Sequence, residues 1–347
     1  MLAQGPLYSL FSAALFGVSP ALAKLVIGDM SPVLLAGLLY LGSGLGLQLL
    51  LFWQRQKTWS ALRGLALHQK LKLAGAVVCG GILAPLCLTF GIQTGTAFEV
   101  SLLLNLETVA TTLIAWLIFH EYIGPRVWTG KVLLLVGAGI ITLQPHLGFV
   151  FSRSALLILG ACLFWGIDNN LTRDVEDLPP TVLASIKGWG AGTFNTALAF
   201  ALGSKLVSPA QVAGSLSIGA LSYGVSLVLF VKALREIGSA RASTYFAAGP
   251  FFGMVAALFF LGEHPSSFQW LSAVFMAAGL WALYGERHSH VHQHEPLRHS
   301  HAHTHDEHHQ HTHDGSEGPE PHTHEHHHDP LTHAHAHSPD IHHRHGH

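Results

Sequence analysis

The chain is dominated by a succession of apolar segments, each about as long as a membrane-spanning helix. A helix of about 20 apolar residues crosses the hydrocarbon core of a bilayer. Polar or proline-containing stretches, such as the one at 173–180, separate the segments. The pattern predicts an all-α integral membrane protein that is surrounded by a lipid bilayer. Its ten predicted transmembrane helices cover residues 6–27, 32–53, 71–93, 98–119, 127–144, 154–172, 180–203, 211–234, 243–262 and 268–285.

Lysine and arginine are concentrated in alternate loops. The loops after the second, fourth and eighth segments carry Arg55, Lys57, Arg63, Lys70, Lys72, Arg126, Lys131, Arg235 and Arg241. The opposite side has only scattered cations, such as Lys24. Because cytoplasmic loops carry the excess of Lys and Arg, we expect both termini in the cytoplasm and the chain in the plasma (inner) membrane.

The apolar part of the chain contains an internal repeat. Residues 14–37 align without gaps on residues 162–185, and the region around Glu121 aligns on the region around Glu263. The alignment predicts two repeats of five helices each. Since five is odd, the second repeat enters the membrane from the opposite side, which is the inverted repeat of many alternating-access transporters. The expected units are 1–148 and 149–286, followed by a tail at 287–347.

Two helix ends carry a resemblance to a known family. With LIFHE at 117–121, FGMVAALFFLGE at 252–263 and two five-helix halves, residues 5–286 resemble the drug/metabolite transporter superfamily, EamA type. The resemblance implies an exporter with ten helices and a central cavity. One position departs from the family, because Thr108 stands where the fourth helix usually has proline, whereas the second half keeps Pro250.

Glu107 lies near the middle of the fourth predicted helix. A carboxylate at that depth costs a few kcal/mol, on the order of 3, unless it faces a cavity or a partner. Asn105 is close in sequence, and Thr111 shares the face of Glu107 at i+4. Glu107 is therefore a candidate proton-coupling or cation-binding group. The alternative is a carboxylate neutralised by a nearby lysine or by hydrogen bonds.

The sixth predicted helix contains Trp165, Asp168 and Asn169. Asp168 aligns with Pro20 in the repeat, which suggests two locally irregular helices at the repeat interface. The segment could instead lie near the membrane surface. Lys187 in the seventh helix could pair with Glu107 or with Asp168, or extend its amine to the interface. We take all four as candidate substrate-binding or coupling residues.

Charged groups also occur at helix ends. The pairs His120–Glu121 and Glu263–His264 could act as gates or entry ligands, or could be solvated helix-end groups. Small residues at four-residue spacing, as in Gly188 and Gly192, permit close packing within the bundle and allow a homodimer as a partner arrangement. Phosphate-binding loops and hydrolase motifs are absent from the sequence. We therefore expect neither an enzyme nor a nucleic-acid-binding protein, and no required cofactor.

The last 60 residues, 288–347, differ from the rest of the chain. They hold 24 of the 28 histidines, nine Asp or Glu and two Arg. Without Phe, Tyr or Trp, this tail cannot bury enough apolar surface to offset the entropy of ordering, so we expect it to be disordered. Imidazole suits Zn, Ni, Co and Cu, and HxH spacing lets neighbouring rings converge on one ion. The candidate ligands are His290, His292, His294, His299, His301, His303, His305, His308, His309, His311, His313, His322, His324, His326, His327, His328, His333, His335 and His337.

These features lead to a main hypothesis and two alternatives. The main hypothesis is a secondary exporter of a small polar solute, with a cytoplasmic tail that binds divalent transition metals. The first alternative is an efflux carrier for the metal itself, and the second is a membrane-tethered metal store or sensor. The tail could also be a passive metal buffer, or a segment that gains positive charge as its histidines protonate.

Overall fold

The computed structural model describes most of the bundle and part of the tail. The described residues are 4–54, 62–119, 123–144, 148–149, 152–173, 175, 178–237, 242, 245–284, 288–294, 297–303, 322–328 and 331–337. Contacts divide the chain into two compact units, residues 1–286 and 287–347. The first unit is a helical bundle, and the second contains the histidine-rich tail.

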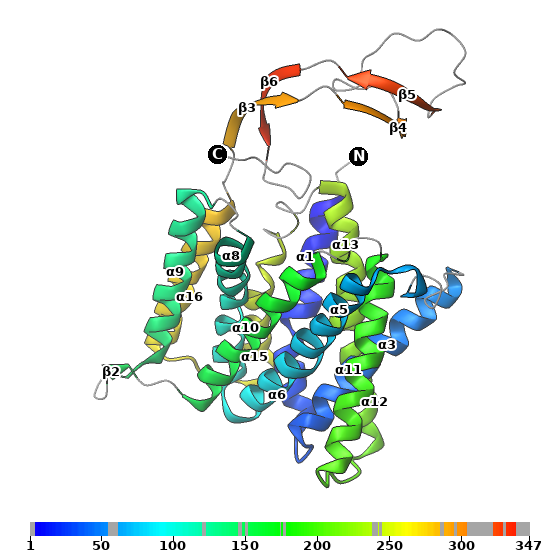
Figure 1. The fold of residues 1–347 in the computed structure, drawn as a ribbon. Helices are drawn as coiled ribbons and strands as arrows, with labels where there is room; N and C mark the ends of the chain where they lie inside the picture. The colour runs from blue at the N-terminus through cyan, green and yellow to red at the C-terminus, as the bar shows by residue number, and fades with distance from the viewer. Residues whose placement is uncertain are drawn as a thin grey trace. The chain divides into compact units, whose positions relative to one another are not determined.

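Five helical spans make up the first half of the bundle (Figure 1). The spans form from apolar runs that are interrupted only by proline, glycine or polar residues. Most interruptions fall where one helix of a span ends and the next helix begins. The elements are α1 (Gln4–Gly17), α2 (Ser19–Ile27), α3 (Pro32–Trp53), α5 (Leu67–Ala76), the π-helix η1 (Val77–Leu83), α6 (Ala84–Thr94), α7 (Ala97–Leu103), α8 (Leu106–Phe119) and α9 (Pro125–Thr142). Each of α1–α2, α3, α5–α6, α7–α8 and α9 is one span.

The second half repeats this series of spans. A short hairpin of β1 (Leu143–Gln144) and β2 (Gly148–Phe149) precedes it. Its elements are α10 (Arg153–Arg173), α11 (Pro180–Ala201), α12 (Pro209–Ile218), the π-helix η2 (Gly219–Val225), α13 (Ser226–Ile237), α15 (Gly249–Leu261) and α16 (Ser267–Tyr284). In the described residues, six helices are long and apolar enough to cross a membrane, and α15 and most of α16 are shorter apolar helices. The prediction of an all-α membrane bundle is confirmed.

Irregular segments recur at equivalent places in the two halves. The π-helix η1 in the third span has its counterpart in η2 of the eighth span, 142 residues later. The fourth span breaks between α7 and α8 at Leu104–Asn105, and a turn at Ala247–Ala248 precedes α15 in the ninth span. Broken helices at matching positions are a mark of inverted-repeat transporters.

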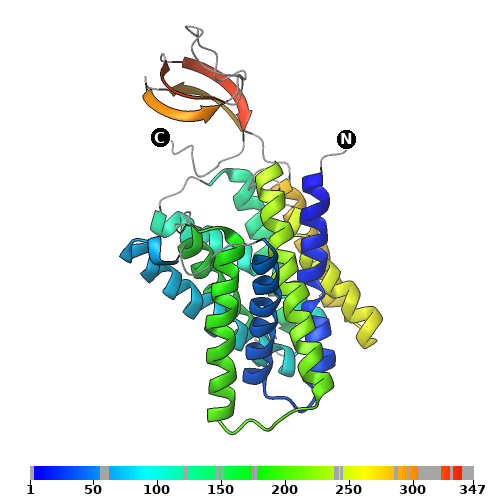
Figure 2. The same ribbon diagram turned by 90° about the vertical axis from the view of Figure 1, so that its right-hand side faces the viewer.

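The first helix of each half packs on the other half. α1 contacts η2, α13 and α15, whereas α10 contacts η1, α6 and α8. In both views α13 runs beside α1 (Figure 1 and Figure 2). Ser12 Oγ donates to Ser226 O at 2.6 Å, across a separation of 214 residues. The two halves are therefore interlocked through their first helices.

Glycines allow the close approach of α3 and α11, the second spans of the two halves. A Cβ on Gly188 would overlap the backbone of Gly44, and a Cβ on Gly192 would overlap the backbone of Leu41. The small-residue pattern in α11 is therefore used within the bundle, as the packing interpretation predicted.

One expectation differs from the structure. The repeat alignment predicted irregular helices around both Pro20 and Asp168. The first span does break at Val18, but α10 runs without interruption from Arg153 to Arg173, so the prediction is wrong for the sixth span. Asp168 has helical geometry there, and its side chain contacts Lys187 on α11 and Thr172 on α10, as described below.

Four segments of the histidine-rich tail are described as strands. They are β3 (His288–His294), β4 (Leu297–His303), β5 (His322–His328) and β6 (Leu331–His337). β3 pairs with β6 and β4 with β5, both antiparallel, in two separate two-stranded sheets. The alternation of histidine with other residues matches the two-residue period of a strand, a signal that the composition argument did not use.

Candidate functional site

The break in the fourth span places Glu107 at a helix N-terminus. α7 ends at Leu103, and Leu102 O accepts both from the backbone N–H of Asn105 and from Asn105 Nδ2, each at 3.1 Å. Glu107 then lies in the first turn of α8, where the helix dipole favours negative charge. Its side chain is half-buried within the bundle. The break therefore places this carboxylate at a half-buried position inside the bundle.

Glu107 joins the two halves through α10. Asn169 Nδ2 donates to Glu107 Oε1 at 2.9 Å and to Thr111 Oγ1 at 3.2 Å. Thr111 Oγ1 in turn donates to Glu107 O at 2.9 Å, and Asn170 Nδ2 donates to Thr111 O at 3.2 Å. Asn169 itself is exposed. The predicted residues Glu107 and Asn169 thus meet at an accessible contact between the first half and the second.

Asp168 points toward α11 and not toward Glu107. Lys187 Nζ lies 2.5 Å from Asp168 Oδ2, and Thr172 Oγ1 donates to Oδ1 at 2.9 Å. Only 5% of the Asp168 side chain and 16% of the Lys187 side chain are exposed. Of the two partners considered for Lys187, the structure selects Asp168. The carboxylate also lies against Gly80 of η1, where a Cβ would overlap it.

The two remaining predicted residues lie beside the site without contacting the Glu107 carboxylate. Asn105 is buried, and its amide also approaches Met276 Sδ at 3.8 Å, on α16. Trp165 Nε1 donates to Gly80 O at 3.1 Å. Tyr40 from α3 donates to the same carbonyl at 2.5 Å. The π-helix η1 thus offers one carbonyl to two aromatic side chains, next to Asp168.

Sequence reasoning missed several residues near the site. Lys131 was taken as a loop cation, but the structure places it in α9, 6% exposed, with Nζ donating to Thr108 O at 3.0 Å. Its position, six residues after the start of an apolar helix, was the sequence signal that could have placed Lys131 inside the bundle. The role of Gly80, and the presence of Tyr40 and Tyr223 near the acids, had no sequence signal because they depend on contacts between distant spans.

Glu263 forms a contact that the sequence left open. Its two carboxylate oxygens accept from the backbone N–H groups of Ala97 (2.8 Å) and Phe98 (2.9 Å) at the start of α7. Lys24 Nζ lies 4.0 Å from Glu263 Oε1 and also donates to Gly95 O. We call these groups the latch. Because α15 runs away from the end of the bundle where α1 begins and α16 ends, the latch lies at the opposite end (Figure 1).

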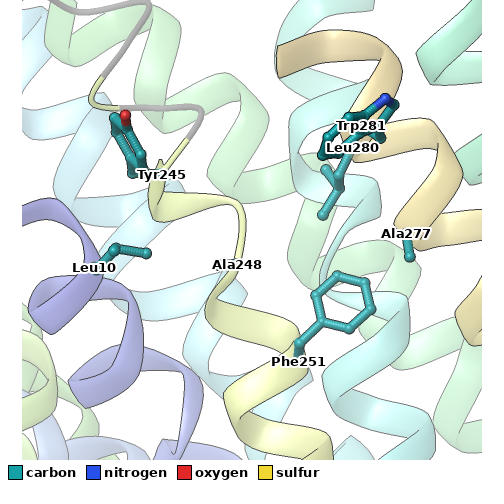
Figure 3. Close-up of a pocket in the computed structure, with 7 residues that line it drawn as sticks. All are labelled: Leu10, Tyr245, Ala248, Phe251, Ala277, Leu280 and Trp281. Atoms are coloured by element: carbon teal, nitrogen blue, oxygen red, sulfur yellow. The ribbon is translucent and has the colours of Figure 1, made fainter. Parts of the chain in front are cut away.

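The structure contains an apolar pocket beside the turn that precedes α15. Its volume is about 340 Å³. Figure 3 shows side chains from α1, the ninth span and α16 around it. The lining residues are Leu10, Tyr245, Ala248, Phe251, Ala277, Leu280 and Trp281.

Within the part of the chain that the structure describes, no group of three or more His, Cys, Asp or Glu is placed to hold a metal ion. Most of the predicted histidine ligands lie on strands β3 to β6. The backbone register pairs His290 with His335, His292 with His333 and His301 with His324. Five predicted ligands lie outside the described residues, as does the predicted pair His120–Glu121. These five are His305, His308, His309, His311 and His313.

The bundle and its broken spans define a ten-helix transporter of the inverted-repeat class, and comparison with known proteins places it in a family. Residues 3–143 and 152–285 match the EamA-like transporter family, so the chain belongs to that family. The resemblance seen in the sequence is confirmed.

Individual relatives agree with this assignment. A protein of Methanothermobacter thermautotrophicus named "Uncharacterized transporter" is 26% identical over 287 residues, which are 78% of this chain and 82% of the relative. "Uncharacterized transporter YwfM" of Bacillus subtilis is 24% identical over 59% of this chain and 70% of its own length. A protein of known crystal structure aligns with a TM-score of 0.61 at 16% identity, covering 81% of this chain and 96% of that protein, and shares the fold.

Proposed function

We propose that the protein is a proton- or cation-coupled secondary exporter of a small polar solute, with Glu107 as the coupling group. The observation that carries this proposal is the contact between Glu107 and Asn169. It combines an accessible carboxylate, a break in a spanning helix and a contact between the inverted halves. Ionisable residues inside the membrane typically mark ion and substrate pathways.

Alternating access follows from this arrangement. When the halves rock, Asn169 on α10 moves relative to Glu107 on α8, and the carboxylate exchanges its amide partner for a proton, an ion or the solute. Protonation would weaken the bond to Asn169, because Glu107 Oε1 accepts best as a carboxylate. The latch would close the end of the bundle opposite the start of α1. We propose that the termini face the cytoplasm at the plasma membrane, as the Lys and Arg distribution indicates.

The test compares Glu107→Gln with the native chain in a bacterial host that lacks the gene. Mass spectrometry of the medium should reveal a solute that the native chain exports, and Glu107→Gln should reduce its export at least tenfold. Glu99→Gln is the matched control, because Glu99 lies on the same span and pairs with Ser152 away from the site. If Glu107→Gln exports every solute as the native chain does, and a pH gradient drives both equally in proteoliposomes, the coupling role is wrong.

We further propose that the tail binds Zn, Ni, Co or Cu. Its strand register supports this, because each of the two sheets aligns histidines at the same level on both strands. In β3 and β6 the aligned pairs are His288–His337, His290–His335 and His292–His333. Residues that face each other across an antiparallel pair have Cβ atoms about 5 Å apart, a spacing from which two imidazoles can reach one ion. Metal would then regulate a transporter of another solute, or be its cargo, and a metal-tolerance panel with tail-truncated and Glu107→Gln strains separates the two.

A further inference from the structure

Lys131 on α9 is a buried cation for which the proposed site gives no role. Its side chain is 6% exposed, and Nζ donates at 3.0 Å to Thr108 O, in the first turn of α8. In the described parts of the bundle, no Asp or Glu oxygen lies within 4.0 Å of this nitrogen. Burial and the positive end of the helix dipole both oppose a cation at this position. An ionisable side chain inside a span therefore calls for a functional explanation.

Lys131 completes the charge balance around the fourth span. Asp168 and Lys187 form an ion pair, and Glu107 is the residue that precedes Thr108. When all four side chains are ionised, the two carboxylates and the two lysines sum to zero. Lys131 is therefore not a surplus charge that awaits an anion. Its contact with a backbone carbonyl indicates a role in the structure of the span.

Side-chain donors crowd the backbone carbonyls at the start of α8. Thr108 Oγ1 donates to Asn105 O at 2.9 Å, and Thr112 Oγ1 donates to Thr108 O at 2.8 Å. Thr108 O thus accepts from two side chains, because Lys131 bonds to the same atom. Side chains that donate to helical carbonyls compete with the backbone N–H groups and bend the helix. These donors therefore favour the break between α7 and α8.

The same kind of backbone hydrogen bond marks the breaks of the two halves. In the fourth span, the N–H of Asn105 donates to Leu102 O at 3.1 Å, and the N–H of Thr108 donates to Asn105 O at 3.2 Å. In the ninth span, the N–H of Ala248 donates to Tyr245 O at 3.2 Å. These are i→i−3 bonds, which are tighter than those of an α-helix. The two breaks share this local backbone although their residues differ.

The second half has a proline where the first half has Thr108. Pro250 stands 142 residues after Thr108, which is also the separation between η1 and η2. Proline breaks a helix because it has no N–H and its ring clashes with the carbonyl at i−4. The residue 142 positions after Lys131 is Ala273, which has no side-chain donor. The half with the proline therefore lacks the lysine, and the half with the lysine lacks the proline.

The break in the fourth span is attached to α9 and α16, which pack on each other. Asn105 Nδ2 approaches Met276 Sδ of α16 at 3.8 Å, and Lys131 reaches Thr108 from α9. Glu107 lies between Asn105 and Thr108 in the sequence and contacts α10. The residues on both sides of this carboxylate are therefore held by the α9–α16 pair, while the carboxylate itself contacts the second half.

We propose that Lys131 is a positioning residue, whose bond to Thr108 holds the break that Pro250 holds in the other half, and that this break places Glu107. Lys131 acts through the backbone and does not touch the solute. The inference rests on the proposed function where it names Glu107 as the group that is placed. The bond also differs from a proline in one respect, because a hydrogen bond can open and form again when the halves rock.

The experiment measures hydrogen–deuterium exchange of the purified full-length protein by mass spectrometry, in peptides that contain residues 104–107. Lys131→Met keeps the length of the side chain and removes the donor, so it should speed the exchange of these amides at least tenfold. Its thermal unfolding temperature should not fall, because an apolar side chain then replaces a buried charge without a counter-ion. A change confined to the break would separate positioning from general stability.

Two further variants make the measurement specific. Thr108→Pro, added to Lys131→Met, should restore slow exchange, because the proline supplies the break without the lysine. Ser272→Ala is the matched control, since Ser272 is buried and donates to Gly137 O of α9 away from the break. It should leave the exchange of residues 104–107 unchanged. Circular dichroism and size-exclusion chromatography establish that each variant is folded.

Export of the solute that the native chain exports is measured with the same variants. Lys131→Met should reduce export several-fold, and the double variant with Thr108→Pro should recover it. Unchanged exchange in Lys131→Met would overturn the proposal, whether or not the double variant folds. A folded double variant that exchanges as fast as Lys131→Met would overturn it too, because proline and lysine would then not be equivalent.

Glu107→Gln, measured alongside, separates this inference from the proposed function. Loss of export in Glu107→Gln, with normal export in Lys131→Met, retains the coupling group and removes the positioning role of Lys131. Fast exchange in Lys131→Met, with normal export in both variants, retains Lys131 as the residue that holds the break and removes Glu107 as the coupling group.

Discussion

The two carboxylates near the site differ in their partners: one has its charge neutralised by a cation, and the other has only an amide partner. Asp168 has a cation and a hydroxyl as partners, and little of its side chain is exposed. Glu107 is half-buried and has an amide partner. In the proposed function, Asp168 and Lys187 therefore stabilise the α10–α11 contact, and Glu107 exchanges ligands.

This division predicts the energetics of the Asp168–Lys187 pair. Lys187→Met should lower the free energy of unfolding by about 3–5 kcal/mol, because it leaves a buried carboxylate without its cation. The double variant Asp168→Asn with Lys187→Met should recover most of that loss. Chemical unfolding in detergent measures both, and Lys205→Met, at an exposed loop lysine, should change nothing. A double variant as unstable as Lys187→Met alone would contradict this account.

The sequence predicted the residues of the site better than their partners. Glu107, Asp168 and Lys187 stand out because charge is rare in apolar spans. The pairing of these three residues depends on how α10 is rotated about its axis. The hydrogen bonds of Asn169 and Asn170, together with the close contact at Gly80, set that rotation. These contacts join residues that are 59, 62 and 88 positions apart. Local patterns carry no information about them.

At the scale of elements, the apolar lengths and the repeat were enough to predict the ten spans. The internal breaks were predicted less well, because a π-helix and a continuous helix have the same apolar composition. Pro20 indicated the break near Val18, whereas the break at Asn105 and the π-helices η1 and η2 had no single-residue signal. Their recurrence in both halves shows that the irregularities belong to the repeat.

The latch predicts a change in access at the end of the bundle opposite the start of α1. Glu263→Gln should weaken the contacts to Ala97, Phe98 and Lys24, because an amide accepts less strongly than a carboxylate and has no charge. A cysteine at the buried Ser101, in a chain whose native cysteines are replaced, should then react several-fold faster with a membrane-impermeant thiol reagent. Glu99→Gln in the same background should react at the unaltered rate. An unchanged rate in Glu263→Gln would show that the latch does not control access.

The α3–α11 contact predicts a graded series on one helix. Gly188→Ala and Gly192→Ala should each lower the free energy of unfolding by about 1–3 kcal/mol, because the added methyl group overlaps backbone atoms of Gly44 and Leu41. Gly190→Ala is the matched control, since its Cβ would lie 3.4 Å from Val77 Cγ1, an ordinary contact. Thermal unfolding in detergent ranks the three variants. Equal losses for all three variants would mean that helix propensity, and not packing, determines the change in the free energy of unfolding.

At the scale of the whole molecule, the bundle and the tail are separate compact units. The bundle matches the EamA-like transporter family, and the tail is rich in histidine. The two units should therefore be separable by truncation, with stability remaining in the first and metal binding in the second.

A chain that ends at Glu286 tests this separation. Its thermal unfolding temperature without metal should match that of the full chain within about 2 °C, and its binding of Zn²⁺ by calorimetry should be lost. In the full chain, Zn²⁺ affinity should fall at least tenfold between pH 7.5 and 5.5, because free imidazole has a pKa of about 6.5 and only its neutral form binds metal. Equal Zn²⁺ binding by the truncated chain, or affinity independent of pH, would contradict the proposal.

The exchange of first helices between the halves has a consequence for biosynthesis. Ser12 bonds to Ser226 and Ser9 to Ala242, across 214 and 233 residues, so these partners of α1 leave the ribosome only during synthesis of the second half. Seven further spans must be inserted into the membrane before α13, which α1 contacts in the folded protein, is present. Long-range contacts of this kind slow folding. The first half released alone would have an unpaired α1, and an early stop codon would yield an incomplete bundle and not a smaller working one.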